Sequence, residues 1–72
     1  MKPNDFPRLR LELETRVQAR TGRRVKNLNI LLSPEGVVLE GNTYTYYDKQ
    51  LAQTSIRDLL PEVRLQNAII VA

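Results

Sequence analysis

The side chains of this 72-residue chain that are best suited to chemistry are cations. Residues 1–36 carry eight Lys and Arg against four Asp and Glu, whereas residues 37–72 carry three against four. We name five of these cations the basic corner: Arg16, Arg20, Arg23, Arg24 and Lys26. The favoured interpretation of the basic corner is a solvated surface at the negative end of a helix dipole. The alternative is functional: clustered cations attract phosphates, so the basic corner would bind anionic phospholipid headgroups or, as a weaker alternative, nucleic acid.

Bond-breaking chemistry has few candidates in this sequence. The chain has no His and no Cys, so acid–base catalysis would rest on Asp, Glu, Lys or Tyr, and no Ser or Thr stands in a nucleophile-elbow context. There is no P-loop and no dinucleotide-binding glycine motif. Asp48 and Asp58 each stand beside a cation and are interpreted as helix-surface charges. The sequence therefore predicts a non-enzymatic protein without catalytic, cofactor-binding or metal-binding residues, cofactor or small-molecule substrate.

Three tyrosines lie close together, at positions 44, 46 and 47. Such a group can stack on bases, sit at a membrane interface, or pack beneath a helix. A contact in the core or between subunits is the favoured interpretation.

The stretch "PRLRLELETR", residues 7–16, alternates apolar and charged residues as a strand does. A helical projection nevertheless places Phe6, Leu9, Leu13 and Val17 on one face. Arg, Leu and Glu are good helix formers, and Gly22 suits the position just after a last turn. We therefore expect a helix over residues 6–21, with Leu11 exposed on its far side.

Residues 24–32 and 37–41 are expected to form an antiparallel hairpin. Leu28, Ile30 and Leu32 alternate with Asn27, Asn29 and Leu31, which is typical of a half-buried strand. "SPEG" then supplies Pro and Gly at turn positions. On this interpretation Val37 and Leu39 face the core and Val38 faces outward. Gly41 either permits a positive φ or a close approach of the backbone, or is an ordinary turn glycine, which is the favoured interpretation.

The remaining residues predict a second helix and a last strand. The helix begins near Thr45 or Tyr46 and ends before Pro61, and its apolar stripe includes Tyr47, Leu51 and Ile56. Residues 63–71 form the strand. Asn67 lies among its apolar residues, where it either bonds a neighbouring segment or faces outward.

The predicted fold class is α+β: an αββαβ two-layer module with two helices on one face of a three-stranded mixed sheet. Residues 1–5 are expected to be a flexible N-terminus and residues 6–72 a single domain.

The second half of the chain resembles the BON domain, a family named for a bacterial osmotic-stress protein and nodulation proteins. The similarity rests on "GVVLEG", "YYDKQLAQ" and "LPEVRLQNAIIV". In these stretches Val37, Leu39 and Gly41 match a V-x-L-x-G strand, and Lys49 and Ala52 match a helical K-x-x-A. Leu65, Asn67, Ile69 and Val71 match the closing strand. The resemblance implies a small bacterial adaptor of the αββαβ type for which binding to phospholipid membranes has been proposed.

A chain this small, without disulfides, gains stability from association, so we expect a homo-oligomer or a complex with a protein partner. The sheet face turned away from the helices is expected to be open, and the candidate self-association residues are Leu11, Leu31 and Val38. No stretch is apolar enough to be a signal peptide, which predicts a cytoplasmic protein, or an envelope-associated one if the chain is a fragment.

Overall fold

The computed structural model describes residues 2–72, and Met1 lies outside the described residues. A 3-10 turn, Pro3–Asp5, leads into α1 (Phe6–Thr21), which is followed by β1 (Lys26–Ser33), β2 (Gly36–Thr43), α2 (Tyr46–Leu59) and β3 (Leu65–Val71). The prediction of a helix over residues 6–21 agrees with α1 at both ends. The predicted flexibility of residues 1–5 stays a prediction.

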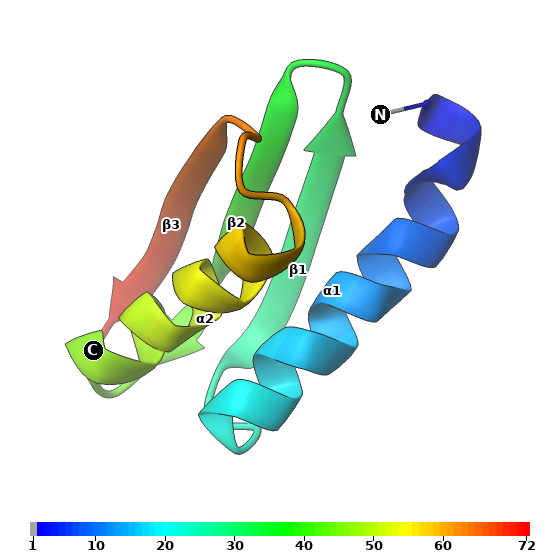
Figure 1. The fold of residues 1–72 in the computed structure, drawn as a ribbon. Helices are drawn as coiled ribbons and strands as arrows, with labels where there is room; N and C mark the ends of the chain where they lie inside the picture. The colour runs from blue at the N-terminus through cyan, green and yellow to red at the C-terminus, as the bar shows by residue number, and fades with distance from the viewer. Residues whose placement is uncertain (1) are drawn as a thin grey trace.

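The three strands form one mixed sheet in the order β1-β2-β3. β1 runs antiparallel to the central strand β2, and β3 runs parallel to β2. Both helices lie on the same side of the sheet (Figure 1). The predicted fold class, an αββαβ two-layer α+β module, is therefore confirmed.

Helix α1 packs through a narrow apolar stripe. Leu13, Val17 and Thr21 are buried, whereas Leu11 is exposed as predicted. Gly22 ends the helix in the left-handed conformation, with φ of 61°, and its N–H bonds the Gln18 carbonyl. The helix thus follows the 3.6-residue period of its apolar side chains rather than the period of two that the sequence also shows.

The hairpin β1–β2 is present, and β2 is longer than the predicted 37–41. Val37 and Leu39 are buried beneath the helices, as expected. Gly41 lies inside β2, so the turn interpretation is wrong. The alternative is confirmed, because a Cβ there would come within 2.8 Å of the Val25 Cγ1 atom and 3.1 Å of the Lys26 carbonyl oxygen. Close packing against the segment that enters β1 therefore explains this glycine.

Helix α2 begins after Thr45, as expected, and ends before Pro61. Tyr47 does not join its apolar stripe: it is 67% exposed, and the buried positions are Asp48, Ala52, Ser55 and Ile56. Strand β3 begins at Leu65, two residues later than predicted.

Asn67 faces α2, so it does not point outward. Its Nδ2 donates to the Lys49 carbonyl at 3.0 Å and to Gln53 Oε1 at 3.2 Å. Its Oδ1 accepts from the Ile69 N–H at 3.2 Å. The polar residue in this apolar strand therefore ties β3 to the helix above it.

The core lies between the sheet and the two helices. It consists of nine buried side chains: Leu13, Val17, Val25, Ile30, Val37, Leu39, Ala52, Ile56 and Ile69. Every element contributes except the 3-10 turn, so the layer of helices and the sheet stabilise each other.

Candidate interaction surfaces

The structure divides the basic corner into paired and unpaired cations. Arg20 Nη1 lies 3.0 Å from Asp58 Oδ2, and Arg16 Nε lies 3.9 Å from Glu12 Oε1. Both are exposed pairs, which contribute little to stability. They still reduce the positive potential that these arginines can offer to an anion.

Arg24 is held most firmly. Its Nε and Nη2 donate to the Asp48 carboxylate at 3.0–3.1 Å, a bidentate contact. Asp48 is only 3% exposed, so the expectation that it is a helix-surface charge is wrong. The Thr45 hydroxyl donates to Asp48 Oδ2 and accepts from the Asp48 N–H, which caps α2.

This pair shifts the pKa of both partners. The hydrogen bonds from Arg24, aided by the Thr45 hydroxyl, hold the pKa of Asp48 below its ordinary value despite the opposing effect of burial. The same contact raises the pKa of Arg24. The pair therefore remains ionised at neutral pH and joins the loop after α1 to the start of α2.

Arg23 and Lys26 are exposed, and within residues 2–72 no ion pair involves either of them. Arg23 lies in the left-handed region with φ of 61°. Together with Tyr44 they line a shallow hollow of about 290 Å³. The part of the basic corner that remains available is therefore this pair of cations beside an aromatic ring.

The three tyrosines are all exposed, Tyr44 the most at 77%. The interpretation that they pack in the core is wrong, because Tyr44 precedes α2 and the first turn of α2 points Tyr46 and Tyr47 into solvent. Exposed tyrosines therefore lie at the same end of the molecule as Arg23 and Lys26, which share a hollow with Tyr44.

The sheet face turned away from the helices is open, as the sequence predicted (Figure 1). By strand alternation it carries one set of side chains, which we call the open face: Asn29, Leu31, Val38, Glu40, Asn42, Gln66, Ala68 and Ile70. Leu31 is 45% and Ile70 64% exposed. Leu31 pairs with Val38 across β1 and β2, so these two candidate residues form one apolar row.

Leu11, the third candidate for self-association, does not join this row. It lies on the solvent side of α1, in the other layer of the fold, and is 65% exposed. The structure therefore brings together Leu31 and Val38 but not Leu11.

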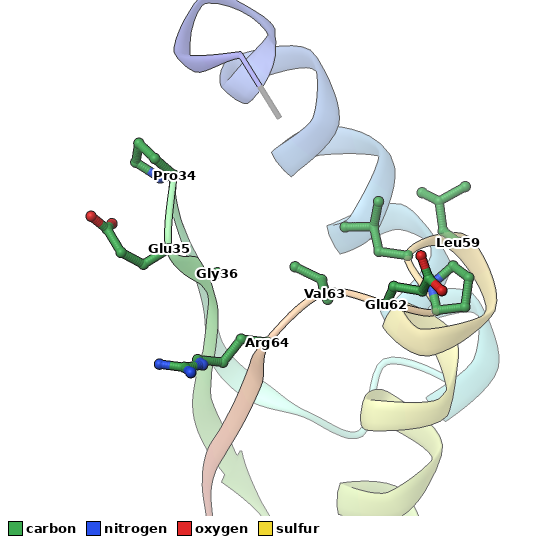
Figure 2. Close-up of a pocket in the computed structure, with 9 residues that line it drawn as sticks. Pro34, Glu35, Gly36, Leu59, Glu62, Val63 and Arg64 are labelled. Atoms are coloured by element: carbon green, nitrogen blue, oxygen red, sulfur yellow. The ribbon is translucent and has the colours of Figure 1, made fainter.

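A hollow of about 410 Å³ lies where the β1–β2 turn approaches the α2–β3 loop (Figure 2). Apolar Leu59 and Val63 line it together with Glu35, Glu62 and Arg64. Arg64 points away from the helices (Figure 2). The backbone closes this end tightly, because a Cβ at Gly36 would collide with the Arg64 carbonyl oxygen.

Within residues 2–72 no three acidic side chains gather in a way that could hold a metal ion. The helices in this part of the chain are too short or too polar to cross a bilayer.

Comparisons of the chain with models of protein families, with curated proteins and with solved structures gave no match.

Sequence reasoning missed the Arg24–Asp48 pair. The two residues lie 24 positions apart, and no local pattern links them. A signal was present in "TYYD", since Thr followed three residues later by an acidic residue is typical of a helix N-terminus and places that residue at a defined position.

Proposed function

We propose that this chain is a non-enzymatic assembly module that acts as a homo-oligomer, with the open face as its contact surface. The observation that carries the proposal is the uncovered apolar row of Leu31 and Val38. On β3, Gln66 is level with Val38, and the apolar Ala68 and Ile70 follow further along the same face. Chains of this size bury only about 60% of their unfolded surface, so covering such a face stabilises them appreciably.

The polar groups of the interior support a structural role. The Thr21 and Ser55 hydroxyls donate to backbone carbonyls of their own helices at 2.8 Å. Asp48 is engaged by Arg24 and Thr45. Three of the four buried polar side chains, Thr21, Asp48 and Ser55, therefore serve the fold, and the fourth, Thr43, has a hydroxyl without a hydrogen-bond partner among residues 2–72.

A second copy fits the charges of the open face. Glu40 lies two residues beyond Val38 on β2, and Arg64, next to Leu65, is level with Gly36 on the other side of Val38. A two-fold axis across the strands at Val38 therefore places Arg64 of the second copy level with Glu40, over the adjacent strand β3. The same axis stacks the two Leu31–Val38 rows at the centre, where an isologous interface needs apolar groups.

The kinship with BON domains is part of this proposal. The αββαβ element order agrees with it, and the resemblance of the second half of the chain remains its only sequence support.

Sedimentation velocity over a range of protein concentrations tests the assembly. We expect the average mass to rise with concentration, and Leu31→Glu to lower it because the row would then bury two unpaired carboxylates. Leu11→Glu is the matched control: the same change, at a similarly exposed leucine on α1, should leave the mass unchanged. A wild-type chain that stays monomeric at high micromolar concentration would contradict the proposal.

Peripheral binding of an anionic membrane is a second candidate function. It is favoured by Arg23, Lys26 and Tyr44 around one hollow, since cations and exposed aromatic rings are the groups that bind lipid headgroups and the interface. The paired arginines of the basic corner contribute less to it.

Sedimentation with vesicles that contain phosphatidylserine tests this candidate. Binding should fall as salt rises and should weaken strongly in the double variant Arg23→Ala, Lys26→Ala. The control is Arg8→Ala with Arg10→Ala, which removes the same charge from the other end of α1. Equal loss in the two variants, or no binding by the wild type, would rule out a specific site.

A further inference from the structure

Strand β3 is an unprotected edge of the sheet. Nothing lies beyond it in the strand order, and α2 covers only its helix-facing side (Figure 1). Residues 65–72, "LQNAIIVA", contain no charge, no Pro and no Gly. Natural edge strands are usually interrupted by charges, prolines or bulges, because an uninterrupted edge pairs with other strands.

The opposite edge, β1, has such an interruption. Its register with β2 shifts between Lys26 and Asn29, and Asn27 sits in the left-handed region with φ of 54°. A bulge and a charge therefore limit pairing along this edge. The two edges of one sheet differ, and only β3 offers a full regular strand.

The ladder shows which β3 groups point outward. Val37 N–H donates to the Arg64 carbonyl, and Ala72 N–H donates to the Thr43 carbonyl. In a parallel pair every second residue bonds its neighbour, so Gln66, Ala68 and Ile70 point their backbone groups at β2. The backbone groups of the alternate residues face the free edge: Leu65, Asn67, Ile69 and Val71.

We propose that β3 pairs antiparallel with β3 of a second copy, centred on Ala68, to give a continuous six-stranded sheet. This inference deepens the proposed self-assembly and depends on it. Centring on Ala68 places Leu65 opposite Val71 and Asn67 opposite Ile69, so outward groups meet outward groups along the whole strand. A centre at any other residue shortens the overlap.

The chemistry of the strand suits a second copy. Both strands are neutral, so their close approach brings no like charges together in a chain of net charge +3. The small Ala68 side chain lies on the two-fold axis, where a larger one would meet its own copy. The Ile69 N–H, now held by Asn67 Oδ1, would exchange that acceptor for a carbonyl of the second strand.

This contact is separate from the open-face contact. Edge pairing joins two sheets within their plane, and the open face stacks two sheets on each other. A chain that uses both contacts forms assemblies larger than a dimer, and loss of either contact leaves a dimer.

Residue-resolved amide hydrogen exchange on the wild-type protein tests the edge. The N–H groups of Leu65, Asn67 and Val71 should become protected as concentration rises, whereas burial of the open face alone gives these outward groups no hydrogen-bond partner. Rapid exchange of all three in an oligomeric sample would overturn edge pairing and leave the proposed function standing. A monomer at every concentration would overturn both.

Val71→Pro provides the matching variant. It removes one outward N–H and no bond to β2, a placement that edge strands tolerate for proline. Its largest assembly should be a dimer, whereas Val71→Ala, which keeps the N–H, should assemble like the wild type. Leu31→Glu should in turn leave an edge-paired dimer with protected amides. If Val71→Pro and Val71→Ala assemble equally, the edge contact is wrong.

Discussion

The two sides of the sheet differ in what covers their side chains. On the side that carries the helices, Leu39 is fully buried and the buried carboxylate of Asp48 forms an ion pair with Arg24. On the open face Val38, the residue before Leu39, has only Leu31 and other side chains of the same surface beside it. The fold buries its first side from within the chain and leaves the second side uncovered, which is why we propose a second copy there.

The largest difference should appear when neighbouring residues of β2 are truncated. Leu39→Ala leaves a cavity in the core and should cost about 3 kcal/mol in the free energy of unfolding. Val38→Ala should cost less than about 1 kcal/mol at a concentration where the chain is dissociated, because its side chain is only half-buried. Urea denaturation of the two variants measures both values, and similar costs would mean that the open face is already covered.

A smaller effect, dependent on pH, should follow from Asp48→Asn. Since the folded-state pKa of Asp48 is lowered, its carboxylate stabilises the protein above the unfolded-state pKa of about 4, and this contribution is lost as pH falls through the folded-state pKa. The wild type should therefore exceed the variant in stability at neutral pH, with the difference vanishing in acid. Thermal unfolding from neutral pH to strong acid measures it. A difference independent of pH would show that the Arg24–Asp48 contact is not the cause.

The smallest expected effect concerns the cap of α2. Thr45→Ala removes the acceptor of the Asp48 N–H and should cost about 1 kcal/mol, whereas Thr45→Ser keeps the hydroxyl and should cost much less. Chemical denaturation of both variants compares them. Equal losses would point to the Thr45 methyl group rather than the cap.

Much of the fold could be predicted from the sequence, because its cues are local. Gly22 and the period of Leu9, Leu13 and Val17 define α1, and Pro34 with Gly36 defines the hairpin turn. At Gly41 the sequence left a turn and a close approach both open, because the contact with Val25 that decides between them is one that no local pattern records.

The surfaces were predicted less completely. The parity of Leu31 and Val38 was sufficient to place both on an open sheet face. The basic corner looked like one site in the sequence, but Asp58 and Asp48 lie in the distant helix α2 and engage two of its arginines. The spacing of Tyr47 predicted a place in the buried stripe of α2. In the structure α2 is rotated so that Asp48 is buried and Tyr47 faces solvent.

The mass of the wild-type chain in solution, measured by sedimentation velocity from low to high micromolar concentration, tests most directly whether the open face needs another copy. We predict a mass that rises with concentration and that Leu31→Glu, but not Leu11→Glu, reduces. A monomer mass at all concentrations, identical in the three proteins, would contradict that claim.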